Sequence, residues 1–218
     1  MCCIAGLAPK AVYPQQLIQA VTALQYLLSA GYSPENIFVG GDSAGAHIAI
    51  SLLSHLSHPH PDPSVPRISL HSNKLAGCFL ISPWVTFSGT SNSMKENANK
   101  DFVIHESLKR YSDMFMNGTK EDEYNTPLSA SVEWWKGFRE VVGEVGVLVG
   151  EYEIFMDDVV SWVDKVKVHN PEIEFFLAPA EIHDQAVVDR GLGLKMPKSE
   201  VFFRQWVMKR LRSAEKEI

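Results

Sequence analysis

The sequence predicts an α/β protein with a mainly parallel sheet and helices on both faces. Short, unbroken apolar runs of strand length recur along the chain, and segments with apolar residues at helical spacing alternate with them. Apolar runs without polar alternation are typical of parallel strands that are buried on both faces. Strands that alternate with amphipathic helices indicate the same layered arrangement. No internal repeat or linker divides the chain, so residues 1–218 are predicted to form one domain.

The first half of the chain begins this pattern. Residues 1–5 predict a short strand end. Apolar residues at helical spacing after Tyr13-Pro14 predict a helix that Gly31 stops, because glycine is common just past a helix end. The run NIFVG at 36–40 is bounded by turn residues and predicts a strand, and the helical period resumes at 46–56.

The second half repeats the pattern three times. Strands are predicted at 75–82 (LAGCFLIS), 145–150 (VGVLVG) and 173–178 (IEFFLA), and helices at 101–117, 157–168 and 199–214. Residues 57–74 are rich in proline and serine and predict a loop. The amphipathic segment 101–118 predicts a small helical cap, which Trp134 and Trp135 are expected to help pack.

The composition excludes several classes of partner. A formal net charge of −6 and a pI near 5.7 argue against nucleic acid and against an anionic membrane surface. The odd number of cysteines, a start without a basic signal-peptide region and the absence of a membrane-length apolar run predict a cytoplasmic protein. We expect no cofactor. His55, His58 and His60 invite a metal site, but no further ligands lie nearby in the sequence, so we expect a solvated loop and no metal.

The segment Gly41-Asp42-Ser43-Ala44-Gly45 fits the G-x-S-x-G pattern between a predicted strand and a predicted helix. In that setting the serine lies on a sharp turn with strained backbone angles, and glycine at both ends is expected to avoid collisions between strand and helix. The Ala44 N–H and the helix dipole would stabilise a developing oxyanion. The alternative is a turn that merely requires small residues.

A serine hydroxyl needs a base, and the base needs an acid to orient it. In this kind of fold the order along the chain is serine, then aspartate or glutamate, then histidine. His183 follows the last predicted strand and is the predicted base. Glu153 lies in the loop after VGVLVG and is the predicted acid, although Asp157 remains an alternative. Asp157 and Asp158 are also well placed to serve as an N-cap and as dipole partners for the helix that follows.

Five motifs resemble the hormone-sensitive-lipase-like group of α/β-hydrolase esterases, particularly its fungal members. The motifs are LAP…YP (7–14), GGDSAGAH (40–47), LISPW (80–84), VGEYEIFMDD (149–158) and AEIHD (180–184). The resemblance implies that Ser43 is the nucleophile, that His183 is the general base and acid, and that Ala44 supplies one oxyanion N–H. Glu153 falls where most members carry an aspartate, and a glutamate can orient the imidazole in the same way.

The resemblance also implies parts that these 218 residues lack. Family members carry a His-Gly-Gly-Gly-type oxyanion loop before the nucleophile, and none is present here. We therefore expect an N-terminally truncated α/β-hydrolase sheet without its first strands. The strand at 36–40 would then have a bare apolar edge, so we expect a partner or a second copy to cover it.

The sequence predicts a carboxylic ester hydrolase that forms an acyl-enzyme on Ser43. Trp84, Phe87 and Phe115 are expected to line the pocket, and their aromatic character favours a small apolar ester. Fungal relatives include steryl-acetate deacetylases and esterases of secondary metabolism. Two alternatives remain open: a non-catalytic or severely impaired protein without the oxyanion loop, and an acyltransferase that passes the acyl group to an alcohol.

Overall fold

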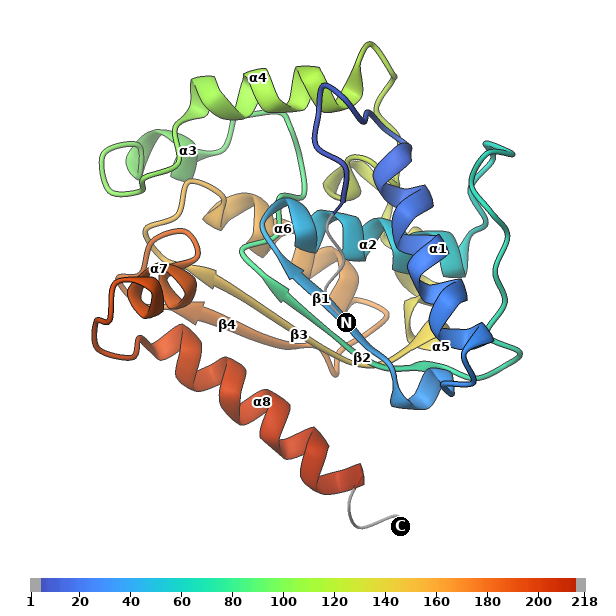
Figure 1. The fold of residues 1–218 in the computed structure, drawn as a ribbon. Helices are drawn as coiled ribbons and strands as arrows, with labels where there is room; N and C mark the ends of the chain where they lie inside the picture. The colour runs from blue at the N-terminus through green and yellow to red at the C-terminus, as the bar shows by residue number, and fades with distance from the viewer. Residues whose placement is uncertain (1–4, 215–218) are drawn as a thin grey trace.

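The structure is a computed structural model that describes residues 5–214. Four parallel strands form one sheet in the order β1 (Phe38–Asp42), β2 (Leu75–Ile81), β3 (Val142–Gly150) and β4 (Glu174–Ala178), as Figure 1 shows. The register pairs Gly41 with Leu80 and Leu80 with Val147, so all four strands end at the same edge of the sheet. The predicted α/β class is confirmed. The strand predicted at 1–5 lies outside the described residues, except for its last residue.

Helices cover both faces of the sheet. The larger core lies on the face that carries α1 (Gln15–Ser29), α2 (Ala44–Ser57), α5 (Phe138–Val141) and α6 (Met156–Lys167). The opposite face is covered by α8 (Lys198–Ala214), as Figure 1 shows. Trp206 of this helix packs with Phe79 and Leu148. Because successive residues of a strand point to opposite faces, the unbroken apolar runs supply both cores.

The predicted cap corresponds to α4 (His105–Met116), which passes over the carboxyl edge of the sheet near α3 (Asn92–Glu96), as Figure 1 shows. The helix begins four residues later than predicted. Asp101 Oδ1 accepts the N–H groups of Phe102 and Val103, and Ile104 is extended, so the first predicted turn is a loop. The Tyr13 N–H donates to the Phe115 carbonyl at 2.9 Å and ties the end of α4 to the start of α1.

Two predictions about side chains are wrong. Trp135 packs edge-on against Trp162 at 5.6 Å in the main core, and Trp134 stacks on His58 at 4.0 Å, so neither belongs to the cap. His55, which lies in α2, and His60 are buried rather than solvated, and His60 Nε2 lies 2.7 Å from the Tyr13 hydroxyl. Within residues 5–214, no group of three or more His, Cys, Asp or Glu side chains is arranged to hold a metal ion.

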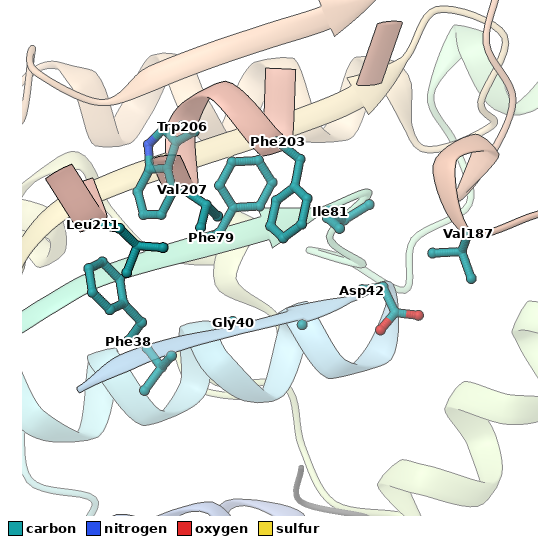
Figure 2. A pocket seen from close by; sticks show the side chains of 12 residues that line it. Phe38, Gly40, Asp42, Phe79, Ile81, Val187, Phe203, Trp206, Val207 and Leu211 are labelled. Atoms are coloured by element: carbon teal, nitrogen blue, oxygen red, sulfur yellow. The ribbon is translucent and has the colours of Figure 1, made fainter. Parts of the chain in front are cut away.

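The strand β1 pairs only with β2 in the described part of the chain, and a groove flanks it on each side. The groove between β1 and α8 has a volume of about 420 Å³; Figure 2 shows Phe38 and Leu211 at one end and Asp42 and Val187 at the other. The second groove, of about 450 Å³, lies between β1 and the helices α1 and α2. The expected partner or second copy at this edge remains a prediction. No helix in residues 5–214 is both long enough and apolar enough to cross a bilayer.

Candidate active site

Ser43 forms the corner between β1 and α2. Its backbone angles are φ 51° and ψ −115°, a sparsely populated combination for a residue with a side chain. Such a conformation costs about 1–3 kcal/mol and persists only where its surroundings hold it. Here the Ser43 N–H donates to the Ile81 carbonyl at 2.9 Å, and the Ser43 carbonyl accepts the N–H of His47 at 3.1 Å. The corner is therefore anchored to the neighbouring strand and to the first turn of α2.

The glycines around Ser43 are not equally required. A Cβ at Gly41 would overlap the backbone carbonyl group of Gly45, and a Cβ at Gly40 would lie 2.5 Å from the Phe79 carbonyl oxygen. A Cβ at Gly45 would meet only Asp42 Oδ1, at 3.8 Å, which is ordinary van der Waals contact. A side chain would therefore collide with its surroundings at Gly41, before Ser43, as expected, but not at Gly45, after it.

His183 and Glu153 are in direct contact. His183 Nδ1 lies 3.0 Å from Glu153 Oε2, and both side chains are almost fully buried. Glu153 follows β3 and His183 follows β4, so neighbouring parallel strands deliver the two groups to one edge of the sheet. An acid on one ring nitrogen holds the imidazole in a defined tautomer and leaves the other nitrogen for proton transfer.

Two residues that the sequence analysis did not single out hold this pair. Ser82 Oγ donates to Glu153 Oε1 at 2.6 Å, and the Gly150 N–H donates to the same oxygen at 2.5 Å. The buried Asp101 accepts the backbone N–H of His183 at 3.3 Å and that of Ile154 at 2.9 Å. Asp101 therefore links the loop that follows β3 to the loop that follows β4.

A sequence signal for these two residues is weak. Ser82 follows an apolar strand directly, so its hydroxyl had to lie at the carboxyl edge of the sheet. Asp101 lies in a loop at a distance of about 50 residues from Ile154, and no local pattern marks it.

The alternative acid, Asp157, has other partners. Asp157 Oδ2 accepts the N–H of Ser93 at 2.7 Å, and Asp158 Oδ2 accepts the Ser91 hydroxyl at 3.2 Å. Both carboxylates lie in the first turn of α6, as predicted, but the N-cap position belongs to Phe155. These contacts tie α3 to α6, and burial raises the pKa of Asp158 to about 6.

The electrostatic environment of His183 is acidic. Burial lowers the pKa of His183, but the hydrogen bond to Glu153 and the charges of Glu153, Asp184 and Asp101 outweigh burial, so the net shift is upward. His183 Nε2 lies 3.3 Å from Asp184 Oδ2. Burial raises the pKa of Asp184 to about 6, and the nearby Asp42 and Glu153 act in the same direction.

The predicted nucleophile lies at the same edge as this pair but is not bonded to it. Ser43 follows β1, and β1 and β4 are the outer strands of the described sheet. Among residues 5–214, the Ser43 hydroxyl makes no hydrogen bond with His183. The structure thus brings His183 and Glu153 together, and places Ser43 at their edge of the sheet with no hydrogen bond to His183 among the described residues.

The three predicted pocket residues form a chain of aromatic contacts near the corner. The Trp84 and Phe87 rings are 4.9 Å apart, and the Phe87 and Phe115 rings are 5.9 Å apart. The backbone N–H of Trp84 donates to the Ser43 carbonyl at 3.4 Å. The ring of the buried His47 contacts both phenylalanines, at 5.7 and 5.4 Å. Apolar rings therefore extend from the Ser43 corner to α4, the helix of the predicted cap.

Ala44 is the first residue of α2, where backbone N–H groups have no partner within the helix. Its position beside the corner is compatible with the expected oxyanion contact. A contact to substrate at Ala44, Trp84, Phe87 or Phe115 stays a prediction.

Comparisons with known proteins agree with this architecture. Two curated relatives are each 28% identical: a putative steryl acetyl hydrolase, mug81, of Schizosaccharomyces pombe over 164 residues, and an esterase of Acinetobacter venetianus over 178 residues. The matches cover 71% and 78% of this chain. They span 40% and 52% of the respective relatives, so this chain corresponds to about half of each.

Solved structures share the fold at lower sequence identity. A hormone-sensitive lipase from a metagenome library superposes with a TM-score of 0.76 at 19% identity, over 94% of this chain and 64% of that one. The structure of EstE5 gives a TM-score of 0.70 at 23% identity, over 85% of this chain and 57% of EstE5. A profile of the alpha/beta hydrolase fold matches residues 6–187, which is most of the chain. The chain therefore belongs to the α/β-hydrolase fold family.

Proposed function

We propose that this chain is a serine-dependent carboxylic ester hydrolase with Ser43 as nucleophile, His183 as general base and Glu153 as the acid that orients it. The observation that carries the proposal is the buried contact between His183 Nδ1 and Glu153 Oε2, at the sheet edge where the strained Ser43 corner lies. A buried histidine with a carboxylate on one nitrogen is expensive to maintain as a purely structural feature.

The proposed reaction proceeds through an acyl-enzyme. His183 takes the hydroxyl proton as Ser43 Oγ attacks the ester carbonyl, and the imidazolium then gives that proton to the departing alcohol. Water repeats the sequence on the acyl group and releases the acid. Ala44 N–H, at the positive end of the α2 dipole, supplies one oxyanion contact.

The proposed substrate is a small ester with an apolar portion. The aromatic chain from Trp84 through Phe87 to Phe115 provides an apolar surface beside Ser43, and α4 covers its far end. The name of the Schizosaccharomyces pombe relative supports an acetyl ester of an apolar alcohol as the first substrate to test.

Active-site phosphonylation tests the nucleophile. The purified 218-residue chain is incubated with a fluorophosphonate probe, and the labelled peptide is identified by mass spectrometry. We expect a single adduct on Ser43, loss of the adduct in Ser43→Ala, and unchanged labelling in Ser88→Ala, which removes an exposed hydroxyl one residue from Phe87. Labelling that persists in Ser43→Ala would overturn the assignment.

The same experiment separates the alternatives left open by the sequence. A folded chain that never reacts with the probe supports the non-catalytic alternative. If Ser43 is labelled, product analysis with an ester and a competing alcohol distinguishes hydrolysis, which releases the free acid, from acyl transfer, which yields a new ester.

A further inference from the structure

We propose that residues 190–196 dock this chain on an anionic lipid surface. These residues, RGLGLKM, form the end of α7 (Gln185–Gly191) and the turn before α8, and we call them the docking loop. All seven of them are exposed. The docking itself requires no catalysis, but its consequence, delivery of an apolar ester to the site from that surface, rests on the proposed function.

The docking loop carries large apolar side chains on a backbone that hydrogen bonds hold in place. Leu192 is 69% exposed, Leu194 is 59% exposed, and Met196 is exposed as well. The Leu194 N–H nevertheless donates to the Asp189 carbonyl at 2.9 Å, and Gly193, at φ 67°, provides the left-handed residue that such a helix end uses. A fixed turn that leaves three large apolar side chains in water is typical of a contact surface for a protein or a membrane.

The exposed charges beside these side chains are all positive. In the segment 187–198 they belong to Arg190, Lys195 and Lys198, and the one carboxylate of the segment, Asp189, is buried. The chain as a whole has a formal net charge of −6, which does not attract it to an anionic surface. Because charges beyond about 10 Å are largely screened by salt, the sign of the charge at the contact decides.

A carboxylate near the docking loop is already paired. Glu200, near the start of α8, lies 2.6 Å from Arg204 and 3.7 Å from Arg190, so two guanidinium groups share it and it does not cancel the positive charge of the segment. Lysine and arginine beside exposed leucine and methionine match the chemistry of a bilayer interface. There, apolar side chains enter the acyl boundary while the cations contact anionic headgroups.

Hydrogen bonds hold the docking loop beside the candidate site. Glu181, two residues before His183, accepts the N–H groups of Lys198 at 2.6 Å and Ser199 at 3.3 Å, which fixes the start of α8. The helix α7 begins two residues after His183, at the carboxyl end of β4 (Figure 1). Both ends of the segment that contains the docking loop are therefore tied to the loop that carries the proposed base.

Further exposed apolar side chains lie near the same site. Phe102 and Ile104, in the loop before α4, are each 56% exposed, and the Phe102 ring lies 5.9 Å from the His183 ring. The exposed Val187 of α7 lines the groove beside β1 together with Asp42, as Figure 2 shows. An apolar ester that is dissolved in a surface at the docking loop would therefore have a short path to the site.

A second copy of this chain fits the docking loop less well than a lipid surface does. Symmetric dimers place the same patch of both subunits against each other. Such a contact would bring the cations of one docking loop against those of the other, and like charges at close range oppose association. Anionic headgroups neutralise the same cations.

Vesicle sedimentation tests the docking without any chemistry. The purified 218-residue chain is mixed with vesicles of phosphatidylcholine, with or without about 30% phosphatidylserine, and the bound fraction is measured after centrifugation. We expect binding to the vesicles that contain phosphatidylserine at about 50 mM salt, and loss of most of it at about 500 mM salt, because salt screens the headgroups.

Two double variants separate the charges from the apolar side chains. Lys195→Gln with Lys198→Gln should weaken the partition by about 25-fold, since each basic residue near an anionic surface contributes about fivefold. Leu192→Ser with Leu194→Ser should weaken it by about tenfold or more, because two apolar side chains no longer leave water. Circular dichroism should show that both variants stay folded, since all four positions are exposed.

The matched controls lie toward the amino edge of the sheet. Val168→Ser changes an apolar residue that is 62% exposed at the end of α6, and Lys74→Gln with Lys136→Gln removes two exposed lysines that precede β2 and β3. Both should bind vesicles like the wild type. Absence of binding by the wild type, or controls that lose as much binding as the docking variants, would overturn the docking. A dimer that the leucine variant dissociates, without any vesicle binding, would assign the loop to self-association and would overturn it as well.

The last measurements distinguish this inference from the proposed function. Ser43→Ala should bind vesicles like the wild type, so the docking stands even where no ester is hydrolysed by any variant, a result that would refute the proposed function alone. In an active chain, the leucine variant should hydrolyse a long-chain nitrophenyl ester held in vesicles more slowly, by the factor that binding loses, and nitrophenyl acetate in solution at the wild-type rate. An equal loss on both esters would overturn delivery from the surface.

Discussion

Replacement of Glu153 by glutamine tests the core of the proposed site with little change in shape. Glu153 Oε1 receives two donors, the Ser82 hydroxyl and the Gly150 N–H, while Oε2 faces His183 Nδ1. A glutamine has one oxygen, and that oxygen must stay where the two donors converge. Its NH₂ group then faces His183 Nδ1 as a donor.

This donor inverts the tautomer of the neutral imidazole. Nδ1 must accept the hydrogen bond, so the ring proton moves to Nε2, the nitrogen that should receive the proton of Ser43. An equivalent carboxylate-to-amide change in a serine–histidine–acid site lowers kcat by about 10⁴-fold, or about 5 kcal/mol of barrier. The fold should lose only about 1–3 kcal/mol, because one charge-assisted hydrogen bond is replaced and two others persist.

Two measurements check the reasoning for Glu153→Gln. The rate of fluorophosphonate labelling at pH 8 should fall by about 10⁴-fold. The ¹⁵N shifts of His183 should change from the Nδ1–H to the Nε2–H tautomer in the same sample. Ser88→Ala is the control for handling and folding. A variant that retains the Nδ1–H tautomer, or that reacts within tenfold of the wild-type rate, would refute the assignment of Glu153 as the orienting acid.

Three further predictions concern stability. Gly41→Ala should lower the free energy of unfolding by about 1–3 kcal/mol, because its Cβ would overlap the Gly45 carbonyl group. Gly45→Ala should leave the free energy of unfolding unchanged or raise it by up to about 1 kcal/mol. Urea titrations in which both variants lose stability equally would contradict this geometry. Burial lowers the pKa of His47 from 6.5 to about 4. Between these pH values the folded state binds fewer protons than the unfolded state, so the protein loses stability as the pH falls from 6.5 to about 4. Relative to His47→Gln, the wild type should therefore lose up to about 3 kcal/mol of its free energy of unfolding between pH 7 and pH 4. If denaturation experiments gave the same difference in free energy of unfolding between the two proteins at both pH values, His47 would not be a buried neutral ring. In hydrogen exchange, amides of β1 should exchange faster than those of β3, because within residues 5–214 β1 pairs with one strand and β3 with two. Equal protection at high dilution would show that the β1 edge is covered.

Much of the site was predictable because strand ends in a parallel sheet converge at one edge. The apolar runs before Ser43, Glu153 and His183 predicted that all three residues follow strands, and the structure places them at the carboxyl edge of the sheet. Their catalytic roles stay a prediction. The order of serine, acid and histidine along the chain supplied the rest.

The parts that could not be predicted depend on contacts across elements. The strand β3 begins at Val142, three residues before the predicted start at Val145. The sequence pattern missed this part because it contains the charged Glu144, which forms an ion pair with Arg210 of α8. Asp101 and Ser82 form hydrogen bonds with His183 and Glu153 from loops, and loop contacts leave no periodic pattern in the sequence. The difference between Gly41 and Gly45 depends on how closely α2 approaches β1, which the motif alone does not specify.

The candidate site has two parts that are held by different contacts, and in the proposed mechanism one of them, Ser43, depends on the position of β1. His183 follows β4, an outer strand of the described sheet, and hydrogen bonds with Asp101 and Glu153 tie it to the loop after β3, a strand that has neighbours on both sides. Ser43 follows β1, which in the described part of the chain pairs with β2 alone and has a groove on each side. A partner or second copy that covered the β1 edge would then act on the reaction through the position of Ser43, while the protonation of His183 would still be governed by its carboxylates.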